Sequence, residues 1–194
     1  MNQKLILASA SPQRKTLLEG LGLPFDVIPS TLDEGVHPEW DDPARRARLL
    51  AELKAKEVAL AHPRDWVIGC DTLVESPDGV IFEKPRDERE ARAMVAAQSG
   101  RTSVVHSGLF VITPEGAHVE GVSSSRVRFK QLTEGELDWW IRTNQWQGRS
   151  GSFQIDGLGQ LMIEEITGDW TGVVGLPVFL LGELLREAGY PLHV

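Results

Sequence analysis

Two basic residues occupy the predicted first turn of a helix, where acidic residues are more usual. The stretch LILASASPQRKTLLEGLG (residues 5–22) begins as an apolar strand and ends as an amphipathic helix, with Arg14 and Lys15 just after Pro12. The first turn of a helix carries unpaired N–H groups and a partial positive charge, which together attract anions. A phosphate at this point would use those N–H groups and both cations. The alternative is that both side chains point into solvent. Because GxxxxGK is absent, the stretch is not a Walker loop.

Acidic residues at two other places could bind a metal ion or act as a base. Asp71 interrupts the apolar run WVIGCDTLVE, and burying an unpaired carboxylate is costly. It therefore either caps the end of this strand or faces a cleft as a metal ligand or general base. Asp33 and Glu34 follow a second short strand, where a solvated turn is the alternative. Since Mg²⁺ takes one or two carboxylates together with substrate phosphates and water, two acidic segments beside a phosphate would meet its needs.

Two lysines could neutralise such a phosphate. Lys54 stands four residues after Leu50 and four before Val58, so it shares the apolar stripe of a predicted helix, to which Leu53 and Ala61 also belong. A lysine on this inner face either extends to the rim or reaches into a cleft. Lys84 lies in the EKP that ends a short strand. The alternative is that its charge is exposed at the surface and has no role in the site.

A glycine-rich segment, GRSGSFQIDGLGQ, surrounds Arg149, Gln154 and Asp156. Its glycines either shape turns or let a ligand approach the backbone closely. The segment does not contain GxGxxG, so it does not indicate a dinucleotide site.

Alternating strand and helix patterns must position these residues. Strands are predicted at 4–8, 25–28, 66–75, 80–85, 152–155 and 160–166, with two long strands around the turn PEG within 102–132. Helices are predicted at 12–21, 41–61, from Asp87 to Gly100, from Thr133 to about 142, and at 175–189, several with capping signals at their starts. The mixture is α/β, and the adjacent long strands argue against a purely parallel sheet.

Composition excludes several classes of protein. A length of 194 residues predicts one domain or two closely joined lobes. The formal charge of -8 argues against a general binder of nucleic acid or membrane surfaces. The single cysteine, Cys70, excludes an internal disulfide, and no segment approaches membrane-spanning length, so a cytoplasmic location is predicted. HExxH, cysteine pairs and GxSxG are absent, which leaves magnesium or manganese as the expected metal. Trp139, Trp140 and Trp146 indicate core packing or an interface.

The order of these pieces resembles the Maf family of nucleoside triphosphate pyrophosphatases over nearly the whole chain. The resemblance rests on LILASASPQRKTLL, STLDEG, LLAELKAKEVA, VIGCDTLV, FEKPRDEREARAMVAAQSGR and RSGSFQIDGLGQLMIEEITGDWTGVVGLP. It implies hydrolysis between the α- and β-phosphates of a nucleotide, giving the monophosphate and pyrophosphate with a divalent cation. The implied fold is an elongated mixed sheet flanked by helices, in two lobes with a central cleft, similar to the inosine triphosphate pyrophosphatases.

The resemblance also implies roles for particular residues. Ser9 and Arg14 would hold phosphate at the helix start, and Asp71 would activate the attacking water. Glu34 and Asp71 would coordinate the metal, Lys54 and Lys84 would neutralise the polyphosphate, and Gln154 and Asp156 would lie near the base or sugar. The catalytic set is thus Glu34, Lys54, Asp71 and Lys84, and the substrate-binding set is Ser9, Ser11, Gln13, Arg14, Thr72, Gln154 and Asp156.

The branch of the family decides the expected substrate. The branch that acts on thymidine and uridine triphosphates typically has SPRR, where this chain has Gln13; Thr72 and the EKP fit that branch. GSFQIDG is nearer to the branch that acts on 7-methyl-guanosine triphosphate. We expect dTTP and UTP, or modified nucleotides, as substrates. The alternatives are the 7-methyl-guanosine branch and a non-catalytic nucleotide-binding regulator of cell division. An inosine or xanthosine triphosphate pyrophosphatase would open with a glycine- and asparagine-rich motif instead. The expected partner is the nucleoside triphosphate substrate, and no binding to nucleic acid or to a membrane is expected. The sequence leaves open whether the protein forms a homodimer.

Overall fold

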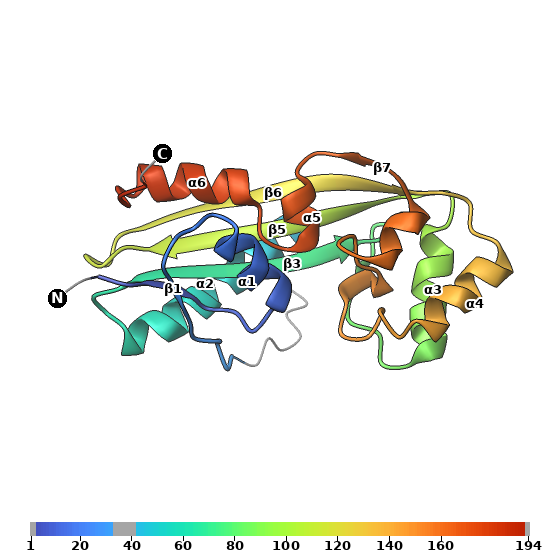
Figure 1. Cartoon of the computed structure of the whole chain (residues 1–194), viewed down its shortest axis with the longest axis horizontal. Coiled ribbons are helices and arrows are strands. Elements are labelled where there is room, and N and C mark those ends of the chain that lie inside the picture. The colour runs from blue at the N-terminus through green and yellow to red at the C-terminus, as the bar shows by residue number, and fades with distance from the viewer. Residues whose placement is uncertain (1–2, 33–41, 193–194) are drawn as a thin grey trace.

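A single mixed sheet runs the length of the molecule. The computed structural model describes residues 3–32 and 42–192, and Figure 1 shows its elongated shape. Within these residues the sheet has seven strands in the order β2-β1-β3-β5-β6-β7, with β4 also paired to β3. The strands are β1 (Leu5–Leu7), β2 (Asp26–Val27), β3 (Trp66–Glu75), β4 (Ile81–Phe82), β5 (Thr102–Ile112), β6 (His118–Phe129) and β7 (Ile163–Thr167). β1 pairs in parallel with β2 and β3, and the other pairs are antiparallel, which confirms the predicted mixed sheet.

Helices gather around the two halves of this sheet. In Figure 1, α1 (Pro12–Glu19), α2 (Pro43–Ala61) and α6 (Val178–Glu187) lie around one half of the long strands, and α5 (Trp170–Val174) lies near the middle. The other half carries α3 (Glu88–Gln98), α4 (Glu134–Arg142) and two short 3₁₀ turns, η1 (Ser150–Ser152) and η2 (Leu158–Met162). We call the half with α1 and α2 the first lobe and the half with α3 and α4 the second lobe. None of the described helices is long and apolar enough to cross a membrane.

Helix α2 lies unusually close to the sheet because two glycines face it. A Cβ on Gly69 of β3 would lie 2.0 Å from the Ala51 carbonyl oxygen, and one on Gly108 of β5 would lie 2.5 Å from the Ala47 carbonyl oxygen. Three of the six buried residues of α2 are therefore alanines, and the full set is Ala47, Leu50, Ala51, Lys54, Ala55 and Val58. This places Lys54 on the inner face, as predicted.

The predicted apolar stripe of α2 was partly wrong. Leu50 and Val58 are buried, but Leu53 is only half-buried and Ala61 is exposed. The close approach to the sheet favours small side chains along the contact line, where Ala47, Ala51 and Ala55 are buried.

The second lobe has an aromatic core of its own. Trp140 and Phe129 are fully buried, and Phe153 packs edge-to-face on Phe129 with ring centroids 5.1 Å apart. Trp146 is also buried in this cluster, and Trp139 packs against it half-buried. The core interpretation of these tryptophans is thus confirmed.

In the C-terminal third, one predicted strand was wrong and another was predicted to begin three residues too early. Residues 152–155 are not a strand. Gly151 and Ser152, where this segment begins, have φ values of 68° and 60°, in the left-handed region and not in the extended region of a regular strand. Residues 160–162 belong to η2, and β7 begins only at Ile163. The short helix α5 was not predicted.

The start of α4 gives a prediction about acid stability. Thr133 and Glu136 form the predicted reciprocal capping box, and Lys130 Nζ donates to Glu136 Oε1 at 2.5 Å. These hydrogen bonds, that from Lys130 first, lower the pKa of Glu136 from 4.5 to about 2. Because the folded pKa is depressed, this stabilisation is complete above about pH 4.5 and is lost as the pH falls towards 2. Glu136→Gln should therefore lower the thermal midpoint clearly at pH 7 and progressively less at pH 4 and pH 3, measured by circular dichroism. An equal loss at all three pH values would contradict the assignment.

Candidate active site

A gap along one edge of β3 creates the site. β5 pairs with one edge of β3 along residues 67–75, so β1 and β4 must both pair with the opposite edge. β1 pairs there with Trp66 to Ile68, and β4 pairs with Val74 and Glu75. Among the described residues no strand pairs with positions 69–73 of that edge between them. Asp71, Thr72 and Leu73 of this stretch therefore line a cleft between the two lobes.

A cavity of about 590 Å³ fills this gap. Its lining includes every described residue of the predicted site: Ser9, Ser11, Gln13, Arg14, Lys54, Asp71, Thr72, Lys84, Gln154 and Asp156. These residues come from the start of α1, from α2, from β3, from the segment after β4, and from the segment after η1. The remaining predicted residue, Glu34, lies outside the described residues. The implied two lobes with a central cleft are thus found.

The start of α1 forms one wall of the cavity. Ser11 is the N-cap, as predicted, and accepts the Arg14 N–H at 3.4 Å, while the Ser11 N–H donates to Ser9 Oγ at 3.3 Å. Lys15 does not line the cavity; it pairs with Glu19 at 3.5 Å on an exposed face of the helix. Only one of the two unusual cations of this turn therefore faces the cleft.

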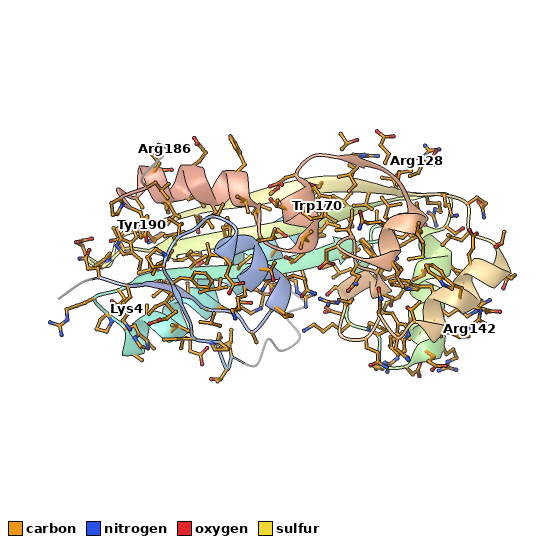
Figure 2. All side chains as sticks on the ribbon, viewed as in Figure 1. Lys4, Arg128, Arg142, Trp170, Arg186 and Tyr190 are labelled. Carbon is orange, nitrogen blue, oxygen red and sulfur yellow. The ribbon has the colours of Figure 1, made fainter. Side chains whose placement is uncertain are left out.

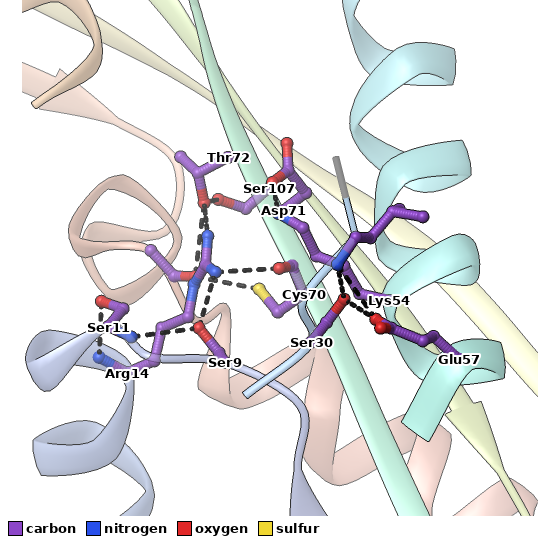
Figure 3. Close-up of polar contacts among 12 residues, drawn as sticks. Ser9, Ser11, Arg14, Ser30, Lys54, Glu57, Cys70, Asp71, Thr72 and Ser107 are labelled. Atoms are coloured by element: carbon purple, nitrogen blue, oxygen red, sulfur yellow. Dashed lines mark hydrogen bonds and ion pairs between the residues drawn. The ribbon is translucent and has the colours of Figure 1, made fainter. Parts of the chain in front are cut away.

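Arg14 is held by four protein acceptors (Figure 3). Its guanidinium donates to Ser9 Oγ at 3.0 Å, to the Cys70 carbonyl at 2.8 Å and to Thr72 Oγ1 at 3.1 Å. Its Nε–H donates to the Gly175 carbonyl at 2.9 Å. A guanidinium has five N–H donors, so one remains for a ligand. Arg14 thus ties α1 to the open edge of β3 and to the turn after α5, and its predicted phosphate contact rests on a single N–H.

The Gly175 carbonyl joins three of these groups. Besides Arg14 it accepts the Cys70 thiol at 3.0 Å and the Thr72 hydroxyl at 3.3 Å. Gly175 has φ +131°, a conformation that side chains rarely adopt, which explains a glycine here. Burial raises the pKa of the Cys70 thiol, so this cysteine stays a neutral donor.

Lys54 and Asp71 form a close buried ion pair on the other side of the gap (Figure 3). Lys54 Nζ donates to Asp71 Oδ1, and the two side chains are only 11% and 7% exposed. Two adjacent elements fix the pair, because Lys54 sits on the inner face of α2 and Asp71 on the strand beneath it. A charged pair at this depth is expensive unless well satisfied, so its position at a cleft favours function over folding.

The segment after β2 is pinned to α2 beside this pair. Glu57 accepts hydrogen bonds from the Ser30 and Thr31 hydroxyls and from the backbone N–H groups of Thr31 and Leu32. The hydroxyl of Ser30, followed by that of Thr31, lowers the pKa of the Glu57 carboxyl. Ser30 lines the cavity, so this carboxylate positions one of its walls.

The donor set at the cleft fits a hard cation better than zinc. Within residues 3–32 and 42–192 no group of three or more His, Cys, Asp or Glu side chains could hold a metal ion. Asp71 and Asp156 bring carboxylate oxygens to the cavity lining. Mg²⁺ is satisfied by one or two such oxygens together with substrate phosphates and water.

Arg149 stands out in the sequence within its glycine-rich segment, but the sequence alone assigns it no role. Arg149 lines the cavity between Gly148 and Gly151, both with φ +68°. The two glycines flanking a basic residue were the signal available in the sequence. Phe153 and Glu83 also line the cavity without having been predicted.

Comparison with known proteins places the chain in a family. The protein-family model described as Maf-like protein matches residues 4–188, so the chain belongs to the Maf family. A relative in Deinococcus radiodurans is named dTTP/UTP pyrophosphatase and is 41% identical over 96% of this chain and 93% of its own length. Relatives with the same name occur in Pyrococcus furiosus (36% identical, 98% and 97% covered) and Syntrophotalea carbinolica (42% identical, 95% and 84% covered).

A solved structure shows a weaker likeness. The nucleoside-triphosphatase / dITP/XTP pyrophosphatase of Mycobacterium abscessus is 17% identical, with a TM-score of 0.44 over 67% of this chain and 76% of that one. A likeness at this level is too low to assign a fold or an activity.

Proposed function

We propose that this protein hydrolyses the bond between the α- and β-phosphates of dTTP and UTP, releasing the nucleoside monophosphate and pyrophosphate. The observation that carries the proposal is the convergence of ten predicted residues, from five segments, on one cavity at the open edge of β3. The names of the full-length relatives support the reaction and the pyrimidine substrates.

The buried pair of Lys54 and Asp71 acts on the attacking water. Asp71 accepts a proton from the attacking water, while the oxygen of that water bonds to the α-phosphorus and the P–O bond to the departing pyrophosphate breaks. Lys54 holds the Asp71 carboxylate in one orientation. Lys84 neutralises part of the polyphosphate, because phosphoryl transfer depends mainly on positioning and charge stabilisation.

A divalent cation completes the site. Asp71 would hold Mg²⁺ or Mn²⁺ together with Glu34, which lies outside the described residues. When bound, the cation supplies an activated water and offsets phosphate charge. A cytoplasmic location, a homodimer and a single domain spanning residues 1–194 are kept as further proposals.

Gln154 and Asp156 lie near the nucleobase or sugar of the bound nucleotide. Both line the cavity from the segment after η1, and Gln154 Nε2 donates to Gln145 Oε1 at 3.1 Å, which fixes its amide. Thr72 also lines the cavity, where its hydroxyl accepts from Arg14. Gln13 accepts from the Ser11 hydroxyl at 3.4 Å, so its amide nitrogen remains available to a ligand.

Product analysis tests the proposed reaction. We expect purified protein with Mg²⁺ to release equimolar monophosphate and pyrophosphate from dTTP and UTP, and at least tenfold less from GTP, ITP and 7-methyl-guanosine triphosphate. Chelation of the cation by EDTA should abolish release. Preference for 7-methyl-guanosine triphosphate would move the protein to the other branch. Binding of nucleotides without turnover of any of them would make it a regulator and overturn the proposal.

A further inference from the structure

Four basic side chains line the cavity, and they fall into two kinds. Arg14 and Lys54, both of the first lobe, are engaged by protein partners. Lys84 and Arg149, both on the side of the second lobe, line the same cavity, and their charged ends make no hydrogen bond or ion pair with any residue the structure describes. The charge available to a ligand is therefore concentrated on one wall.

The loop that carries Arg149 is fixed from beneath. The side-chain amide of Gln98, fully buried at the end of α3, donates to the Gly151 carbonyl at 2.8 Å. The indole N–H of Trp140, fully buried in α4, donates to the Ser152 carbonyl at 2.7 Å. Buried side chains of two helices of the second lobe thus donate hydrogen bonds to this loop. These hydrogen bonds hold the backbone that carries Arg149 in place.

The same loop is joined to the segment that carries Lys84. The Gly151 N–H donates to the Glu83 carbonyl at 3.3 Å, and a Cβ on Gly151 would lie 2.9 Å from Val74 Cγ1. The two unengaged cations are therefore held on adjacent segments against the end of β3. On the Lys84 segment the nearby acid, Glu83, already pairs with Arg46 of α2 at 2.8 Å, so it does not neutralise the wall.

We propose that Arg149 is a substrate-binding residue that donates to phosphate oxygens of the nucleoside triphosphate, alongside Lys84. This inference rests on the proposed function and assigns a residue that the predicted site lacked. A guanidinium suits the task, because its planar fork matches two phosphate oxygens at once. Because Asp71 and Lys54 belong to the first lobe and Arg149 to the second, the triphosphate bridges the cleft and holds both lobes against the reacting bond.

The test compares ligands that carry only part of the nucleotide. Arg149→Gln and Arg149→Lys would be titrated calorimetrically with pyrophosphate, which has no base, and with thymidine, which has no phosphate. Arg142→Gln is the matched control, since Arg142 is an exposed arginine at the outer end of α4, away from the cavity lining (Figure 2). We expect Arg149→Gln to weaken pyrophosphate binding at least tenfold and to raise the KM for dTTP. Thymidine binding should stay within twofold, and Arg149→Lys should recover part of the loss.

Two results would overturn the inference. Unchanged pyrophosphate affinity in Arg149→Gln would remove the phosphate contact, and loss of thymidine binding with pyrophosphate binding intact would make Arg149 a reader of the base. Both differ from failure of the proposed function, in which the unaltered protein releases no pyrophosphate from any nucleotide. Thermal unfolding of each variant, expected to match that of Arg142→Gln, separates a lost contact from a disturbed loop.

Discussion

Replacing Asp71 by asparagine is expected to lower kcat for dTTP about 10²- to 10⁴-fold, the usual contribution of a positioned general base. The amide keeps the shape of the carboxylate but cannot accept the proton of the attacking water. The change also removes the negative partner of the buried Lys54 ammonium, so stability must be followed beside activity. Pyrophosphate release under saturating nucleotide, with thermal unfolding of the same preparation, gives both quantities.

Two companion variants keep this prediction decisive. Asp71→Glu retains the charge beside Lys54 but displaces the carboxylate, so it should fold and still lose most of kcat. Asp138→Asn changes an exposed carboxylate on α4 that pairs with Arg92, and it should leave kcat unchanged. Near-normal turnover in a folded Asp71→Glu and Asp71→Asn would eliminate Asp71 as the base.

Replacing Gly69 by alanine is expected to destabilise the fold by about 1–3 kcal/mol, the scale of overpacking in a close-packed core. The new methyl group would lie 2.0 Å from the Ala51 carbonyl oxygen and 2.8 Å from the Ala55 Cβ, and backbone cannot yield as a flexible side chain can. Helix α2 must therefore move away from β3. Because α2 carries Lys54, we also expect kcat to fall, although Gly69 itself does not line the cavity.

Urea unfolding and dTTP turnover measure the two effects. Gly182→Ala is the matched control: it lies in α6, and apart from its chain neighbours and the nearby backbone of its own helix no heavy atom lies within 4 Å of its added Cβ. It should raise stability by about 0.5–1 kcal/mol, as alanine does in an open helix position, without altering kcat. Equal unfolding midpoints for Gly69→Ala and the unaltered protein would mean that α2 does not sit against β3 as described.

The sequence by itself determined most of the elements and most of the candidate site. The periodicity of apolar residues predicted β1, β3, β5, β6 and the long helix α2. These elements bury one face or both, and the buried positions carry apolar residues at regular spacing. Capping residues placed the starts of α1 and α4, since an N-cap bond is local in the chain. The order of motifs identified the family, and with it ten cavity residues that no single spacing specified.

Tertiary structure decided what the local patterns could not. Residues 152–155 have the composition of a strand, but the buried donors of Gln98 and Trp140 hold the adjoining loop in a left-handed bend that only the second lobe enforces. The buried stripe of α2 follows its contact with Gly69 and Gly108, residues distant in sequence.

The cations of the cleft make the same point about the site. The sequence marked Arg14 as out of place in a first turn, but only the fold brings four acceptors from three segments around its guanidinium. It likewise leaves Lys84 and Arg149 without partners among the described residues. Which cations are available to a phosphate depends on acceptors far away in the chain, because hydrogen-bond satisfaction is a property of the packed structure.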